Sequence, residues 1–132
     1  MSSLKVTKYL SKILKVNELT TLLNGGLIYR EVRPTNSEQN DIVINVNFLK
    51  DRYETGVNYG IANINIYSKA LSNGLMNTAY FDTVYNKIIE IFEKRNYCYN
   101  SLTFNIEFTK TFQELLQNNW YYLNIRLNVQ LN

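Results

Sequence analysis

Two stretches of the chain repeat apolar side chains at the spacing of an α-helix. Apolar positions recur three and four residues apart over residues 4–16, and again over residues 78–95. Such stripes predict helices that each bury one face. The first stripe comprises Val6, Tyr9, Leu10, Ile13 and Leu14, and the second comprises Phe81, Val84, Tyr85, Ile88 and Phe92. Either Asn77 or Thr78 is the predicted N-cap of the second helix.

A shorter helical piece is predicted directly after the first helix. Asn17 is its candidate N-cap. In a helix that begins there, Leu19, Leu22 and Leu23 would lie close together. The following Asn24-Gly25-Gly26 can adopt the left-handed backbone that ends a helix. The chain is therefore expected to leave the helical region here and enter a sheet.

Five further segments have the pattern of β-strands. Apolar and polar residues alternate over residues 41–48, 59–67, 102–108 and 121–131, and residues 27–32 form a shorter candidate strand. A polar loop, residues 33–40, contains the only proline, Pro34. Residues 50–58 are longer than a tight hairpin turn, so we expect them to form a loop that projects from the sheet.

Taken in order, the predicted elements define an α+β fold. The order is α-β-β-β-α-β-β, with about five strands, and no repeat or long linker divides residues 1–132 into more than one domain. Clean alternation is typical of an antiparallel sheet that is covered on one face only. We therefore predict two layers: a mostly antiparallel sheet with the two main helices packed on one face.

Composition narrows the classes of function. The chain has 132 residues, of which 45% are hydrophobic and 19% charged, so it should fold as a globular domain around one core. Its net charge of +3 is too small to indicate nucleic-acid binding by itself. With Cys98 as the single cysteine, no disulfide can form within the chain. No apolar run is long enough to span a membrane, and we expect a soluble chain with no membrane partner.

The residue types needed for most catalytic sites are missing. The chain has no histidine, which removes His-containing catalytic triads, His-ligated metals and the usual proton shuttle near neutral pH. The nearest carboxylate pairs, Asp51 with Glu54 and Glu90 with Glu93, are interpreted as solvated surface groups. We therefore predict a non-enzymatic protein without catalytic residues, cofactor or metal site.

Two surfaces are candidates for binding. The second face of the last strand comprises Tyr122, Asn124, Arg126, Asn128 and Gln130, a set with little formal charge that suits a wet protein interface. Codon bias in an AT-rich genome is an alternative source of so many asparagines. Along the first helix, Lys5, Lys8, Lys12 and Lys15 form a basic stripe opposite the apolar one. That stripe is either a solvated helix face or a contact for an acidic partner or nucleic acid.

The order of these segments resembles that of tail terminator or tail-completion (neck) proteins of long-tailed bacteriophages. The likeness is carried by the amphipathic first helix, the Leu-rich turn at residues 18–29 (ELTTLLNGGLIY), and residues 61–69 (IANINIYSK) followed by the second long helix. Trp120 then opens the terminal alternating strand. The family often has a proline just before its second strand, whereas Asp41 stands there in this chain.

The resemblance implies a structural virion protein. Members of that family form homo-oligomeric rings, commonly hexamers, that end the tail tube. The implied partners are further copies of the chain, the tail-tube protein and a head-connector or head-closure protein, with DNA passing through the ring lumen. The implied location is the virion tail or neck, after synthesis in the bacterial host cytoplasm. Arg33 in the first loop, and Asp51, Arg52 and Tyr53 in the second, would be candidate contacts between subunits or toward the tube.

A different class of function is kept as the alternative. The chain would then be a small nucleic-acid-binding or regulatory module that uses the basic stripe of the first helix. The stripe has no interleaved aromatic residues, which argues against binding single strands by base stacking.

Overall fold

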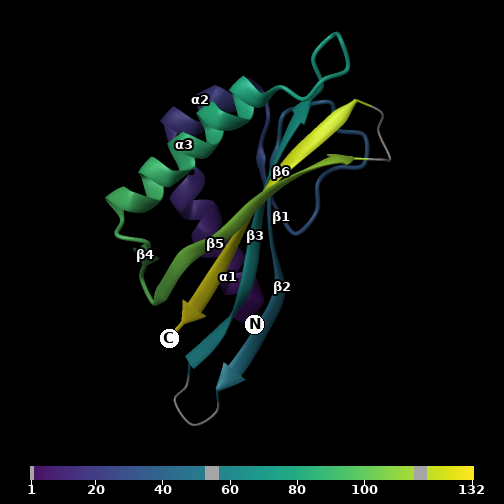
Figure 1. Ribbon diagram of the computed structural model, residues 1–132. Helices are drawn as coiled ribbons and strands as arrows, with labels where there is room; N and C mark the ends of the chain where they lie inside the picture. The colour runs from purple at the N-terminus through teal and green to yellow at the C-terminus, as the bar shows by residue number, and fades with distance from the viewer. Residues whose placement is uncertain (1, 53–56, 115–118) are drawn as a thin grey trace.

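The computed structural model describes residues 2–52, 57–114 and 119–132, and within them the chain forms helices and a single sheet (Figure 1). The helices are α1 (Ser2–Leu14), α2 (Asn17–Leu23) and α3 (Thr78–Lys94). The strands are β1 (Ile28–Arg30), β2 (Ile42–Arg52), β3 (Val57–Lys69), β4 (Cys98–Tyr99), β5 (Leu102–Glu114) and β6 (Trp120–Leu131).

The sheet has the strand order β1-β2-β3-β6-β5-β4. The short edge strand β1 runs parallel to β2, and every other neighbouring pair is antiparallel. Two long hairpins, β2-β3 and β5-β6, make up the body of the sheet and meet where β3 pairs with β6 from Asn58↔Leu131 to Lys69↔Trp120. Each outer strand of this body carries one register shift, in β2 between Val46 and Phe48 and in β5 between Ile106 and Phe108.

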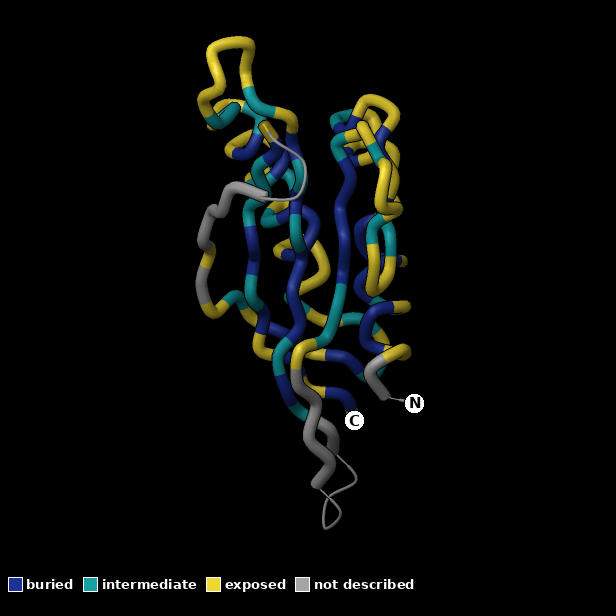
Figure 2. Tube along the Cα trace, turned by 90° about the vertical axis from the view of Figure 1, so that its right-hand side faces the viewer, coloured by how far each residue is buried: buried dark blue, intermediate teal, exposed yellow. Residues whose placement is uncertain are grey.

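One face of the sheet carries the hydrophobic core. Figure 1 shows the helices on the same side of the sheet, and Figure 2 shows buried positions running along the central strands and recurring turn by turn on the helices. Val6, Leu10 and Ile13 of α1 and Val84, Ile88 and Phe92 of α3 are among the helical members of this core. The sheet contributes Ile42, Ile44, Ala62, Ile64, Ile66, Ile125, Leu127 and Val129. The inward positions along each strand are two residues apart, as the pleat of a strand requires.

The predicted α+β class, with a mostly antiparallel sheet and its helices on one face, is confirmed. The side chain of Asn77 caps α3 by accepting a hydrogen bond from the backbone N–H of Tyr80 at 3.2 Å. The short helix is also present, and it ends at Asn24 with a φ of 49° in the left-handed region. The helix boundaries differ from the predicted ones by no more than two residues at either end.

One expectation about the strands was wrong. Residues 50–58 were expected to form a projecting loop, but β2 continues to Arg52 and β3 begins at Val57. These strand ends extend beyond the helical layer (Figure 1), and the sequence there lacks the regular alternation that predicted the rest of both strands. The sheet also has a sixth strand, because positive φ values at Asn96, Tyr97 and Asn100 fold the chain after α3 back so that β4 pairs with β5.

The core should depend strongly on the buried stripe of α1. We expect Leu10→Ala to lower the free energy of unfolding by about 2–5 kcal/mol, because Leu10 is completely buried and its truncation leaves a cavity. The matched control is Leu4→Ala on the same helix, where the side chain is 47% exposed and the loss should be within about 0.5 kcal/mol. Urea denaturation measures both, and equal losses would contradict this account of the core.

Candidate functional site

The face of the sheet opposite the helices carries a row of asparagines. The register places Asn45 of β2 beside Asn63 of β3, and Asn65 of β3 beside Asn124 of β6. The Asn63 amide donates to Asn45 Oδ1 at 3.1 Å, and the Asn124 amide donates to Asn63 Oδ1 at 3.0 Å and to Asn65 Oδ1 at 2.8 Å. An amide side chain both donates and accepts, so a row of them can satisfy itself across strands.

This amide network is partly closed to solvent. Only 3% of Asn63 and 8% of Asn124 is exposed. Because their polar atoms bond to one another, the burial does not leave these groups unsatisfied. A shallow hollow of about 280 Å³ lies over the network and is lined by Asn45, Asn47, Asn63, Asn65, Tyr122, Asn124 and Arg126. The surface is therefore polar, and among the described side chains that line it, Arg126 carries a formal charge.

The five residues predicted on the second face of β6 do lie together on this surface. Tyr122 and Arg126 are half-buried, and the Tyr122 ring packs on Tyr67 of β3 with ring centroids 5.3 Å apart. Asn128 and Gln130 are exposed, and Asn128 donates to Asn105 of β5 at 3.3 Å. Asn124 is thus buried and bonded within the subunit, whereas Asn128 and Gln130 are exposed to solvent.

Arg33 closes the opposite end of this face. Its guanidinium lies 4.4 Å from the Tyr67 ring centroid and 4.5 Å from that of Trp120, so the cation is held between two aromatic rings. Its Nε donates to Asp41 Oδ2 at 3.2 Å, and the two side chains are only 7% and 1% exposed. Arg33 was predicted to contact other subunits. In the structure its guanidinium is instead bound within its own subunit, by the two aromatic rings and the Asp41 carboxylate.

The other predicted contact residues of the second loop are only partly placed. Asp51 and Arg52 belong to the end of strand β2. Their side chains, and the whole of Tyr53, lie outside the described residues. Their predicted role stays a prediction.

Asp41 holds the ends of the first loop together, a role that the sequence did not reveal. Its carboxylate accepts hydrogen bonds from the backbone N–H of Leu27 at 2.8 Å, from Arg33 and from the Ser37 hydroxyl. Gly26 fits beside this junction because it lacks a side chain: a Cβ there would stand 1.8 Å from the Asn40 carbonyl oxygen. The tight approach of residues 26 and 40 gives the loop one fixed path over the sheet.

Replacing the Asp41 carboxylate should destabilise the fold. Asp41→Asn keeps the size but leaves the Arg33 cation buried without its counter-charge, and we expect a loss of about 3 kcal/mol in the free energy of unfolding. Glu38→Gln removes an exposed charge from the same loop and should change it by less than about 0.5 kcal/mol. Chemical denaturation compares the two, and similar small effects would contradict a structural role for the pair.

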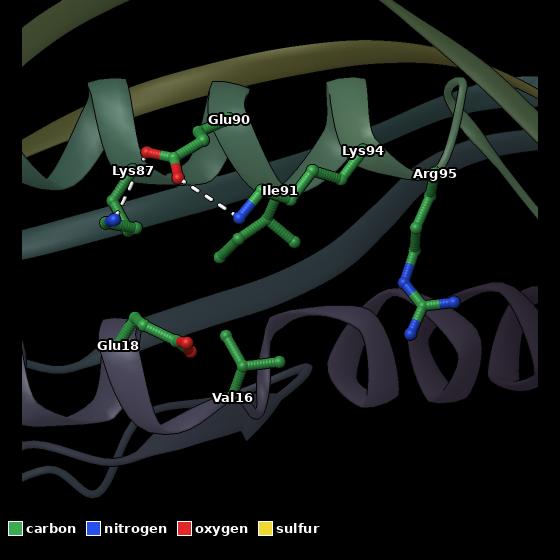
Figure 3. A pocket seen from close by; sticks show the side chains of 7 residues that line it. All are labelled: Val16, Glu18, Lys87, Glu90, Ile91, Lys94 and Arg95. Carbon is green, nitrogen blue, oxygen red and sulfur yellow. Dashed lines mark hydrogen bonds and ion pairs between the residues drawn. The ribbon is translucent and has the colours of Figure 1, made fainter.

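A second hollow lies on the helical side, between α2 and the C-terminal half of α3 (Figure 3). It has a volume of about 420 Å³ and an apolar floor that includes Val16 and Ile91. On its rim, Glu90 accepts from Lys87 at 3.1 Å and pairs with Lys94 at 3.3 Å, and these contacts lower the pKa of Glu90 below its usual range. Lys and Glu at such spacings on a helix are ordinary surface pairs. They match the interpretation of Glu90 as a solvated group.

The basic stripe of α1 is found where the sequence placed it. Lys5, Lys8, Lys12 and Lys15 are all exposed, while Val6, Leu10 and Ile13 face the sheet. The Lys5 ammonium lies 5.9 Å from the Tyr9 ring centroid. The stripe and the amide network therefore lie on opposite faces of the two-layer domain.

Three further properties concern the described residues only. None of their helices is long and apolar enough to cross a membrane. Among them, no three His, Cys, Asp or Glu side chains are grouped so that they could hold a metal ion. Tyr80, which packs beside Asn40 and Asp41, has a pKa raised to about 12, chiefly because burial disfavours its charged form.

Comparison with known proteins identifies a shared fold. No protein-family model matches the chain, and no curated protein matches it. Among solved structures, 24 chains match. One belongs to the virion of a native gene transfer agent particle, and it matches with a TM-score of 0.66 over 98% of this chain and 95% of that chain, at 8% sequence identity. At so low an identity the likeness shows the fold alone.

Proposed function

We propose that this chain is a structural subunit of a phage-like virion. The observation that carries the proposal is the likeness of fold to a chain of a gene transfer agent virion, which extends over nearly the whole length of both chains. Fold by itself does not define function. The sequence resemblance to tail terminator and tail-completion proteins, found from the residues independently of the fold comparison, points to the same class.

Within that class, the proposed role is a homo-oligomeric ring, a hexamer in the family that the chain resembles. The ring ends the tail tube and joins the tail to a head-connector or head-closure protein, with DNA passing through its lumen. The surface chemistry supports a role in assembly. The described side chains of the amide face are mostly uncharged, and Asn128 and Gln130 are exposed at one end, as suits a polar protein contact. A catalytic role is not proposed, since the sequence lacks histidine.

The ring is tested on the purified chain and in the particle. Mass photometry and negative-stain images should show closed rings of about six copies. Deleting the gene from the genome that encodes it should leave filled heads and tails that do not join, and a plasmid copy should restore joined particles. A chain that stays monomeric at micromolar concentration, together with normal particles after deletion, would refute the proposal.

The basic stripe of α1 supports a second candidate, a nucleic-acid-binding module. All four lysines are exposed on one helix face, and phosphate contacts of this kind weaken as salt rises. If this candidate holds, double-stranded DNA should shift in a mobility assay at 50 mM salt and be released by 200 mM. Lys8→Glu with Lys12→Glu should abolish the shift, while the matched change Lys87→Glu with Lys94→Glu on α3 should keep most of it. No shift at low salt would remove this candidate.

A further inference from the structure

Strand β2 has a long edge that no other described strand covers. The edge strand β1 pairs with β2 only at Ile42, Val43 and Ile44. In the described part of the chain, the rest of β2, residues 46–52, has β3 as its single neighbour. Ile42 donates outward to the Leu27 carbonyl and Ile44 accepts from the N–H of Glu31, so alternate residues of β2 turn their backbone groups away from β3. After the register shift at Val46/Phe48 this alternation places Leu49 and Asp51 outward.

Strand β5 has a matching unpaired edge on the other side of the sheet. Its neighbour β4 covers only Leu102 and Thr103, and Phe104 donates to the Tyr97 carbonyl. Beyond that point, β5 to Glu114 pairs with β6 alone among the described residues. The same alternation, carried through the shift at Ile106/Phe108, turns the backbone N–H of Thr109 outward. A protein usually blocks or shortens such edges, because they are templates for pairing with another chain.

The two edges complement each other. Three successive antiparallel pairings separate β2 from β5, so the two strands run in opposite directions. A neighbouring copy brought up by rotation about an axis near the strand direction would therefore set its β2 antiparallel to β5. We propose that copies of this chain join head to tail through backbone pairing of residues 46–52 of one copy with β5 of the next, which extends the sheet around the ring. The inference rests on the proposed ring and gives its contact.

The short edge strands set the register of this contact. Through the strand register, residues 46–52 of β2 lie beside the first half of β3. The part of β5 that β4 does not cover lies at the level of the second half of β3. The displacement is about six residues, or roughly 20 Å along the strands. The four long strands of one copy span about 19 Å across the sheet. A displacement of roughly 20 Å along the strands for every ~19 Å across them means that the strands of a closed ring are inclined by about 45° to the ring axis, which is within the range at which sheets close into barrels. An interface used in this head-to-tail way closes into a ring when the rotation permits.

This contact assigns the two faces of the subunit to the two surfaces of the ring wall. The amide face, with Asn63 and Asn124, would form one surface, and the helices with the basic stripe would form the other. The lumen is therefore lined by only one of them.

Proline substitutions at the outward N–H groups test the contact. Asp51→Pro and Thr109→Pro each remove a donor that β3 and β6 do not use, a change that edge strands tolerate. We expect each proline variant to keep its circular dichroism spectrum and to lose rings in favour of monomers by mass photometry. Asp51→Ala and Thr109→Ala keep the donor and should form rings like the unmodified chain.

A mixture of the two proline variants separates head-to-tail pairing from other arrangements. Asp51→Pro keeps its β5 edge and Thr109→Pro keeps its β2 edge, so mixing them should give one-to-one dimers and no rings. Dimers of either proline variant alone would indicate pairing of like edges and would overturn the inference. Rings formed by both proline variants would overturn it while leaving the proposed ring intact. An unmodified chain without rings would instead refute the proposed function.

Discussion

The structure depends on the burial of one aliphatic face of the sheet under α1 and α3. Residues such as Ile44, Ile64 and Ile125 have no exposed area, and they meet the stripes of Leu10 and Ile88 from the helices. Burying such side chains contributes about 1.5–3 kcal/mol each, more than the roughly 0.5–1.5 kcal/mol of a typical neutral hydrogen bond such as those between the asparagines. The helical layer thereby fixes which side of every strand looks inward. The amide face of the sheet and the basic stripe of α1 are the sides that this packing leaves outside.

On the outer face of the sheet, buried polar side chains need hydrogen-bond partners. No helix of the described residues covers this face, yet Asn63 and Asn124 are almost fully enclosed and hydrogen-bond to neighbouring amides. A buried amide must be hydrogen-bonded, and here its partners come from adjacent strands. The result is a surface whose described asparagines are held in place by their own hydrogen bonds. Such a surface needs little reordering on contact with another protein, which lowers the cost of association.

The subunit has two kinds of surface for contacts: side chains on the faces of the sheet and backbone groups along its edges. The Arg33 cation packs between the rings of Tyr67 and Trp120 and so holds the first loop against the sheet. This packing also covers part of both rings. Because β1 and β4 are short, much of the backbone edge of β2 and of β5 has no strand neighbour among the residues that the structure describes. Side-chain chemistry on the faces and backbone chemistry on the edges can therefore serve different partners.

The sequence by itself determined the elements with a regular period. Local alternation showed the strands at residues 41–48, 59–67 and 121–131 and grouped Tyr122 with Gln130, because a strand turns every second side chain to the same face. The apolar stripes with a 3.6-residue period likewise predicted the two main helices. The same period placed the four lysines on the outer face of α1. Neither inference needs to know what lies across the sheet.

Only the tertiary structure decided which distant residues meet. The clamp of Arg33 on Trp120, the use of Asp41 to fix the loop, and the amide row across β2, β3 and β6 each join residues from separate segments. The continuation of β2 to Arg52 and the short strand β4 also escaped the pattern, because neither segment has a regular alternation in the sequence. Contacts of this kind depend on strand order and register, which the folded chain sets through packing and which a local period does not encode.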